Sequence, residues 1–382
     1  MSILTKLIFK FILVVCSLVM VVGCTSPATA PTSTAEGVNQ SRDIRDIYQA
    51  ISITPQPNNR LCWNTGDSLE QTEAQWNEFI ANPMFEEGLA FVLFVTDGAE
   101  VLGRETHRIA PNTPIHLTYR GYYHNANDSS ASQTVRYIAL LNEQQLPNAF
   151  DDSDTPYHDM VFNYHETQTF DITVPALDEG IHEFILIGVQ QADLSNLGNI
   201  GLFQSRLTLI VGNPPLVFDA TNYVSVEPYE YRTSANADNY WSVNVHGDQS
   251  QKAWAYPEVY KPATNQLDFY ISTGYMISTN AQVEHDISPQ SQPIALITLL
   301  DYVQVPFQQD KMVFYGILSP DNAYSFIPAS IDVSGESRKR ELLVVQISYP
   351  RFPNCFLFPS QPEGRYFSFA VSARRYGIDV QN

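Results

Sequence analysis

From about Leu89 onward, apolar residues occur in short runs that clusters of Gly, Pro, Asn and Asp separate. Ile115, Leu117 and Tyr119 alternate with polar residues, which is the pattern of a strand with one buried face. Because no helical pattern lies between the runs, their even spacing predicts antiparallel β-sandwiches rather than a parallel α/β sheet. The predicted strands of the first half contain LAFVLFV, PIHLTYRGYY, TVRYIALL, TFDITV, HEFILIGV and RLTLIVG.

Helical periodicity is confined to residues 41–85. A first short helix is predicted over 41–52, where Ile and Tyr side chains recur at helical spacing. A second is predicted from Ser68, because Gln71 stands three residues later as in a capping box and an apolar stripe follows. The remainder of the mature chain is therefore expected to be mainly β.

The order of features in the first half returns in the second half. The segment IALLNEQQLPNAF at 138–150 is echoed by ITLLDYVQVPF at 297–307 with one constant offset. Three further pairs follow in the same order: MVF at 160–162 and 312–314, HEFILIGV at 182–189 with RELLVVQI at 340–347, and RLTLIVG at 206–212 with YFSFAVS at 366–372. This order predicts a tandem duplication.

The chain breakers Gly212-Asn213-Pro214-Pro215 mark the boundary between the two copies. We therefore expect two tandem immunoglobulin-like antiparallel β-sandwiches, at 86–213 and 214–382. The antibody type is excluded, since neither copy has a Cys pair with a Trp between.

The N-terminus has the pattern of an export signal. Lys6 and Lys10 precede an apolar run over 11–22, which is shorter than the roughly 20 residues that span a bilayer and is typical of a signal peptide. The run ends in Val21-Val22-Gly23-Cys24, which resembles the lipobox of bacterial lipoproteins. The departure is a Val where that motif most often has Leu.

The resemblance implies that residues 1–23 are removed and that a diacylglyceryl group is attached to Cys24. Membrane lipid then anchors the protein on an extracytoplasmic face, at the cell surface or in the periplasm. Residues 24–40 are rich in Thr, Ser, Ala and Pro and are expected to form a flexible tether. Thr25, in place of an Asp, favours an outward location where an outer membrane exists.

Two cysteines remain in the mature folded part. Cys16 leaves with the signal peptide and Cys24 is lipidated, which leaves Cys62 and Cys355 of the four. Two thiols in an exported protein commonly pair, so a disulfide between them is predicted. The alternative is two separately buried free thiols, which pack as small apolar groups.

The net charge of the chain limits the kinds of molecule it can bind. The chain has 21 basic and 41 acidic residues and a net charge of −20, which repels phosphate backbones and anionic headgroups. Nucleic acid is therefore excluded as a partner. With 44% hydrophobic and 16% charged residues, the composition is that of a folded protein.

Motifs for chemistry are sparse. The sequence has no H-E-x-x-H, C-x-x-C, G-x-S-x-G, P-loop or G-x-G-x-x-G pattern, so no catalytic residue and no cofactor is predicted. An acidic loop offers oxygen ligands for calcium but breaks the EF-hand pattern, and a solvated loop is its alternative. The candidate calcium ligands are Asp151, Asp152, Asp154 and Asp159, and a second metal candidate is His158, Asp159, His165 and Glu166.

Aromatic residues gather between residues 223 and 260. Exposed Tyr and Trp faces bind sugar rings or partner side chains, because they combine apolar area with a polar tip. Core packing of strand residues is the alternative. The candidate ligand platform consists of Tyr229, Tyr231, Tyr240, Trp241, Trp254 and Tyr256.

Three functions remain open. The first is a non-catalytic binding or adhesion module that recognises an unknown protein or glycan partner. The second is a carbohydrate-binding lipoprotein of an uptake system, which requires the aromatic residues to be exposed together. The third is a secreted glycoside hydrolase, although no motif pairs two carboxylates.

Overall fold

The computed structural model describes most of the chain beyond residue 86, and all described residues belong to the compact unit Asp43–Asn382. The described residues are 74, 76–78, 80, 81, 87–97, 100–102, 106–125, 128, 131–150, 155–190, 192, 202–214, 221–231, 243–247, 259–274, 292–308, 310–319, 322–335, 337, 339–351 and 371–381.

Helix is present where the second helix is predicted. Ala74, Trp76–Glu78, Ile80 and Ala81 are helical, within the segment that starts at the Ser68 capping box. The first predicted helix, at 41–52, lies outside the described residues. No helix in the described part of the chain is long and apolar enough to cross a membrane.

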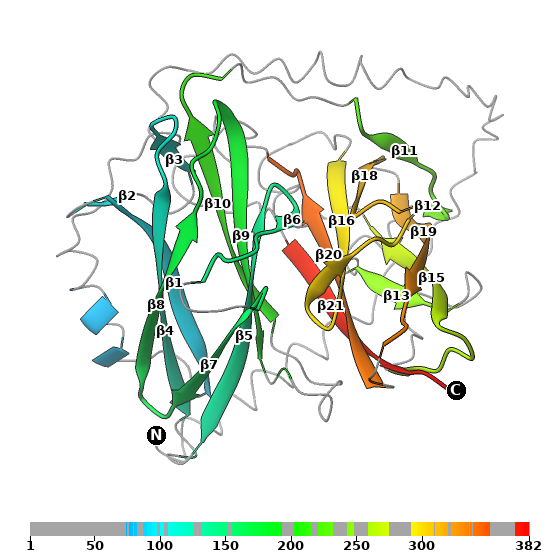
Figure 1. Ribbon diagram of the computed structural model, residues 1–382, viewed down its shortest axis with the longest axis horizontal. Coiled ribbons are helices and arrows are strands. Elements are labelled where there is room, and N and C mark those ends of the chain that lie inside the picture. The colour runs from blue at the N-terminus through cyan, green and yellow to red at the C-terminus, as the bar shows by residue number, and fades with distance from the viewer. Residues whose placement is uncertain are drawn as a thin grey trace, which may run out of the picture. The chain divides into compact units, whose positions relative to one another are not determined.

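The first sandwich contains two sheets with the strand orders β2-β1-β4-β8 and β3-β10-β9-β5-β6, where β7 also pairs with β5 (Figure 1). The sequence runs named above become β1, β4, β5, β8, β9 and β10. The bounds are β1 (Glu87–Asp97), β2 (Glu100–Leu102), β3 (Thr106–Ile109), β4 (Ile115–Asn125), β5 (Ser132–Leu141), β6 (Gln144–Gln145), β7 (His158–Asn163), β8 (Thr167–Val174), β9 (Gly180–Gln190) and β10 (Leu202–Val211).

The second sandwich contains sheets with the orders β11-β18-β16-β20-β21-β14 and β12-β19-β15-β13, where β17 also pairs with β16. The bounds are β11 (Val224–Val226), β12 (Glu230–Tyr231), β13 (Asn244–His246), β14 (Val259–Tyr260), β15 (Gln266–Thr273), β16 (Gln292–Leu300), β17 (Val303–Val305), β18 (Val313–Leu318), β19 (Asn322–Asp332), β20 (Lys339–Ser348) and β21 (Val371–Asp379).

The prediction of mainly β structure in antiparallel sandwiches is confirmed. Three edge pairs differ, because β3 with β10, β11 with β18 and β14 with β21 run parallel. In each pair the short edge strand comes earlier in the chain than its partner. The segment between them is long enough to return the chain in the same direction, which a tight hairpin cannot do.

The strand order of the first sandwich matches that of the second from β5–β10 to β16–β21. Leu140 pairs with Gln145 on β6, and Leu299 pairs with Gln304 on β17. On the other side, Leu141 faces Phe184 of β9 as Leu300 faces Leu342 of β20. The segments 138–150 and 297–307 therefore occupy equivalent strands, as their sequences predict.

Two of the four sequence pairs are out of register and need correction. In the first sandwich Met160 pairs with Val135. In the second, Ile294 is equivalent to Val135 and pairs with Gly316, so Gly316 rather than Met312 is the counterpart of Met160 and the two MVF segments are not equivalent. In the last strands, Arg206 faces Ile185 as Arg375 faces the equivalent Leu343, so the counterpart of RLTLIVG begins at Arg375 and is not YFSFAVS. Short apolar triplets and strands recur in any β protein, so these two matches reflect composition rather than position.

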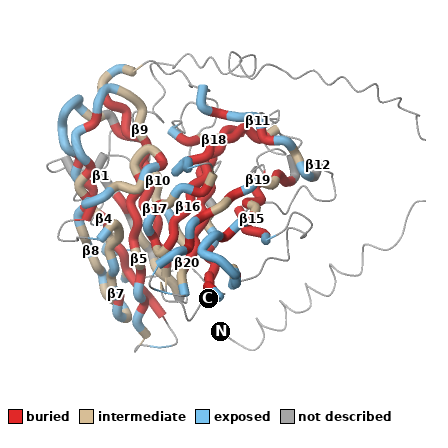
Figure 2. The backbone as a smooth tube through the Cα atoms, turned by 45° about the vertical axis from the view of Figure 1, so that its right-hand side comes forward, coloured by how far each residue is buried: buried red, intermediate tan, exposed pale blue. Residues whose placement is uncertain are grey.

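Each sandwich has its own core, and a third apolar cluster joins them. One core includes Leu117, Tyr137 and Phe184, and another includes Phe269, Leu296 and Tyr376. The third draws on β5 and β9 of the first sandwich and on β16 and β20 of the second. The buried residues of these strands are red in Figure 2. The buried members of this third cluster include Ile138, Leu140, Ile185, Ile187, Ala295, Ile297, Leu299, Leu343 and Val345.

Candidate functional site

A polar site lies where the two sandwiches meet, and it is built on two tight turns. Asn142 and Glu143 between β5 and β6 have φ values of 51° and 63°, and Asp301 and Tyr302 between β16 and β17 have 50° and 67°. Two left-handed central residues are typical of the type I′ hairpin turn. Asn and Asp suit the first position because they tolerate this conformation better than other residues with a side chain.

Each turn is fixed to its neighbouring strand by a reciprocal pair of bonds. The amide of Asn142 donates to the Glu183 carbonyl at 2.9 Å, and Oδ1 of Asn142 accepts from the Glu183 amide at 3.0 Å. Asp301 makes the same two bonds with Glu341, both at 2.8 Å. The residues after each turn are therefore held in one orientation.

Gln145 and Gln304 form a clasp between the sandwiches, which we call the glutamine clasp. The backbone N–H of Gln145 donates to the side-chain Oε1 of Gln304 at 2.6 Å, and the backbone N–H of Gln304 donates to the side-chain Oε1 of Gln145 at 2.8 Å. Nε2 of Gln145 donates to the Tyr302 carbonyl at 2.8 Å, while Nε2 of Gln304 donates to the Glu143 carbonyl at 3.0 Å. Each bond from the first sandwich to the second has an equivalent bond in the opposite direction, so the four bonds are related as by a two-fold axis.

The same two-fold relation holds for the remaining hydrogen bonds of the two side-chain NH₂ groups. Nε2 of Gln145 also donates to the Pro156 carbonyl at 3.0 Å, and Nε2 of Gln304 donates to the Met312 carbonyl at 3.2 Å. Each side chain thus uses its oxygen once and its NH₂ group twice. An amide can satisfy this set but a carboxylate cannot, because a carboxylate has no donor.

An arginine crosses from the first sandwich to the second. Arg206 on β10 forms an ion pair with the wholly buried Glu183. Its other nitrogens donate to the Ser348 carbonyl at 2.7 Å and the Tyr349 carbonyl at 2.6 Å, both of the second sandwich. Glu183 therefore positions a guanidinium that binds backbone carbonyls across the interface.

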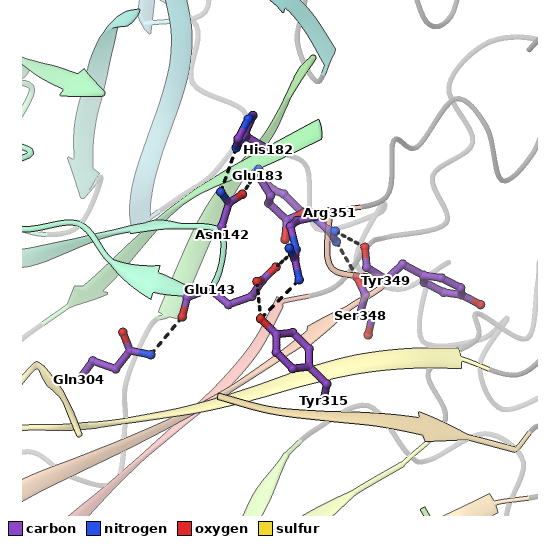
Figure 3. Close-up of polar contacts among 10 residues, drawn as sticks. Asn142, Glu143, His182, Glu183, Gln304, Tyr315, Ser348, Tyr349 and Arg351 are labelled. Atoms are coloured by element: carbon purple, nitrogen blue, oxygen red, sulfur yellow. Dashed lines mark hydrogen bonds and ion pairs between the residues drawn. The ribbon is translucent and has the colours of Figure 1, made fainter. Parts of the chain in front are cut away.

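A second carboxylate of the first sandwich is held by the second sandwich (Figure 3). The Glu143 side chain has no exposed surface, and its Oε2 accepts from the Tyr315 hydroxyl at 2.9 Å. Its Oε1 lies 3.4 Å from Nε of Arg351, whose side chain is 40% exposed. The group is thus a buried acid with one strong neutral donor and one partly solvated cation.

Burial governs the protonation of both acids. It raises the pKa of Glu143, although Arg351 and Tyr315 oppose this. It also raises the pKa of Glu183, against the effect of Arg206 and with a further increase from Glu143. The cause is the loss of hydration, which disfavours the charged form of a carboxyl group.

The other end of the interface has a related set of groups. Arg136 binds Asp159 through two bonds of 2.6 Å, and its guanidinium lies 3.9 Å from the ring centre of Tyr157 and 4.6 Å from that of Tyr302. Burial raises the pKa of Tyr302 to about 12. A guanidinium that contacts two aromatic faces is a favourable cation–π arrangement.

These groups can hold the sandwiches in one geometry. Because the side chains of Glu143 and Glu183 have no exposed surface, a substrate would reach them only if the sandwiches separated. Removing one partner of such a buried pair is costly, since the other charge is left uncompensated.

The residues of the two predicted metal sites have other partners where they are described. Asp159 binds Arg136, His158 packs against Phe170 at 4.9 Å between ring centres, and His165 contacts Nδ1 of His124 through Nε2 at 2.7 Å. Within the described residues, no three His, Cys, Asp or Glu side chains gather as metal ligands. Glu166 accepts from Asn163 and Gln168, and Asp151, Asp152 and Asp154 lie outside the described residues.

One residue of the predicted aromatic platform is described with its side chain. Tyr229 is 57% exposed, and its ring meets Phe326 edge to face at 4.7 Å. Tyr231 belongs to β12, but its side chain is not described. Tyr240, Trp241, Trp254 and Tyr256 lie outside the described residues, as do Cys24, Cys62 and Cys355.

Sequence reasoning missed the interface, although the sequence carries a signal for it. A strand that is buried on both faces is expected to be continuously apolar rather than alternating. IALL on β5, ILIGV on β9, IALITLL on β16 and LLVV on β20 have this form. The signal is the lack of alternation in these runs, which distinguishes strands covered on both faces from strands with one solvent-facing side.

The chain matches no protein-family model and no curated protein. Among solved structures it is similar to the CARDB domain of PF1109 from Pyrococcus furiosus, at 10% identity over 34% of this chain and 95% of that one, with a TM-score of 0.21. It is also similar to AggA, the major subunit of aggregative adherence fimbriae from Escherichia coli, at 10% identity over 34% of this chain and 98% of that one, with a TM-score of 0.22. The fibronectin(III)-like modules of Clostridium thermocellum CbhA match at 8% identity over 76% of this chain and 94% of that one, with a TM-score of 0.17. These TM-scores are low, so the fold assignment follows from the sheets themselves.

Proposed function

We propose that this protein is a membrane-anchored, extracytoplasmic lipoprotein that acts as a non-catalytic binding or adhesion module. The observation that supports it best is the apolar cluster between the sandwiches, together with the glutamine clasp. We expect two sandwiches joined in this way to behave as one rigid body. Binding loops and faces on a rigid scaffold lose less conformational entropy when a partner binds.

The anchoring part of the proposal comes from the sequence. The apolar run and Cys24 resemble a lipoprotein signal, and residues 24–40 would place the rigid body away from the membrane. The two sandwiches would derive from one ancestral sandwich by tandem duplication, which the matched strand order and the clasp support. Each copy then contributes equivalent residues to the interface.

Expression of the full chain and of its Cys24→Ser variant in a bacterial host tests the anchor. Metabolic labelling with a fatty acid should label the wild-type protein, while the variant should be unlabelled and be either unprocessed or released from the membrane. Equal labelling of both proteins would overturn the lipoprotein assignment.

Binding is tested separately on the solubilised full-length protein. We expect it to adhere to immobilised cell-surface material in a saturable way, without release of reducing sugar. Hydrolysis that rises in proportion to protein concentration would instead favour the glycoside hydrolase alternative, with its carboxylates outside the closed interface.

A further inference from the structure

The face of the sheet β12-β19-β15-β13 that points away from the core combines the exposed ring of Tyr229 and the partly exposed rings of Tyr270 and Phe326 with a row of hydrogen-bonding groups. Leu267, Phe269 and Ile271 of β15 belong to the core of the second sandwich. Because successive side chains of a strand point to opposite faces, the residues between them face outward. The same alternation holds on β19, where the core contains Ile327, Ala329 and Ile331.

The outward residues form four cross-strand rows. They run from an aromatic end to a polar end, and about 7 Å separates one row from the next along the strands. From the first to the last, the rows are Ser272 with Phe326, Tyr270 with Pro328, Asp268 with Ser330, and Gln266 with Asp332.

The aromatic end continues onto the neighbouring strands. Phe326 contacts Tyr229 at 4.7 Å on one side and His246 at 5.2 Å on the other, both edge to face. His246 and Ser272 are wholly buried, Phe326 is partly exposed and Tyr229 is 57% exposed. The exposed surface of this row therefore begins at Phe326 and extends over Tyr229.

The polar end is a connected set of groups. Nε2 of Gln266 donates to the Ser330 hydroxyl, which in turn donates to Oδ1 of Asp268. Gln266 and Asp268 are exposed and Ser330 is partly exposed. An amide, a hydroxyl and a carboxylate held side by side can donate to and accept from neighbouring hydroxyl groups of one ligand.

We propose that this face binds an extended, uncharged polysaccharide, an inference that rests on the binding function proposed above and names its ligand class. The apolar faces of sugar rings stack on aromatic side chains, and their hydroxyls bond to amides and carboxylates. The exposed and partly exposed residues of β15 and β19 on this face include Asp268 and Asp332 and no Lys or Arg. In a chain of net charge −20, such a face repels anionic polymers and fits a neutral one.

The test is calorimetric titration of the solubilised full-length protein with neutral hexasaccharides of glucose, mannose and xylose, and with oligogalacturonate as the anionic probe. At least one neutral hexasaccharide should bind. Tyr229→Ala and Asp268→Ala should each weaken that binding at least tenfold. The matched controls Val224→Ala and Asp178→Ala should leave it unchanged, because both residues are exposed and lie off this face.

Three results would overturn the inference: no neutral hexasaccharide binds, oligogalacturonate binds at least as tightly, or the two face variants bind as the wild type does. None of them would touch the binding function itself, which depends on saturable adhesion of the wild-type protein to cell-surface material. If adhesion persists while all hexasaccharides fail, the binding function stands and the assignment of a neutral polysaccharide alone is wrong.

Discussion

Replacing Gln304 by Ala tests whether the glutamine clasp stabilises the joined sandwiches. The change removes an acceptor for the Gln145 amide and two donor bonds, to the carbonyls of Glu143 and Met312. A typical intramolecular hydrogen bond contributes about 1 kcal/mol net, and a buried partner left unpaired costs more. With Gln304 only 8% exposed, we expect the free energy of unfolding to fall by about 2 to 4 kcal/mol.

The equivalent Gln145→Ala variant provides an internal comparison. Gln145 makes the same three kinds of bond but is more exposed, so water replaces part of what is lost. We expect a decrease of about 1 to 3 kcal/mol. The exposed neighbour Gln144 supplies the control, since Gln144→Ala should change stability by less than about 0.5 kcal/mol.

The assay is urea unfolding of each protein followed by circular dichroism. Because the separate cores are untouched, loss of the clasp should also lower the slope of the transition or split it into two. The reasoning is refuted if Gln304→Ala behaves as Gln144→Ala does, or if only one of the two clasp variants is destabilised.

Two further predictions concern protonation and the remaining thiols. The pKa of Glu143 is raised by burial, so its protonated form favours folding and the associated stability is lost as pH rises above about 4.3, the ordinary value for Glu. The stability difference between Glu143→Gln and wild type should therefore grow in favour of the variant from pH 5 to pH 8, and a flat or falling difference in urea unfolding would contradict this. For Cys62 and Cys355, mass spectrometry of non-reduced mature protein should find one disulfide-linked peptide pair, and two free thiols would exclude the bond.

The sequence was sufficient for the fold class because the strands obey local rules. Ile115, Leu117 and Tyr119 alternate in sequence and are all buried on one face of β4. The two turns were also visible as an equivalence of IALLNEQQ and ITLLDYVQ. A repeat with constant offset constrains the register of a strand and its hairpin together, so this match survives in the structure.

The interface could not be predicted from the same rules. The bond from the Gln145 amide to Gln304 joins residues that are 159 positions apart, and nothing local to either glutamine specifies its partner. For a related reason, the sequence did not reveal that Asp159 binds Arg136 and that His165 contacts His124. Closeness in sequence placed His158, Asp159 and His165 together, whereas the pleat of β7 directs adjacent side chains to opposite faces.

At the two ends of the interface, equivalent positions carry different groups: where one end has a carboxylate the other has a phenol, and the reverse. This difference explains why the first sandwich pairs with the second. Glu143 of the first turn meets Tyr315, whereas Tyr302 of the second turn lies near Asp159. By strand register Tyr315 is equivalent to Asp159, because it pairs with Ala295 as Asp159 pairs with Arg136. Each end thus combines a carboxylate and a guanidinium with phenol groups: Tyr315 at the end of Glu143, and both Tyr157 and Tyr302 at the end of Asp159.

Pairing of like sandwiches would lose this balance. Two copies of the first sandwich would bring Glu143 against Asp159, and two copies of the second would bring Tyr302 against Tyr315 with no carboxylate for Arg351. Like charges facing each other across an interface are unfavourable, and Arg351, whose side chain is 40% exposed, would lose its carboxylate partner. The arrangement with one copy of each sandwich is therefore favoured over both alternatives, and covalent linkage in one chain supplies that arrangement at high effective concentration.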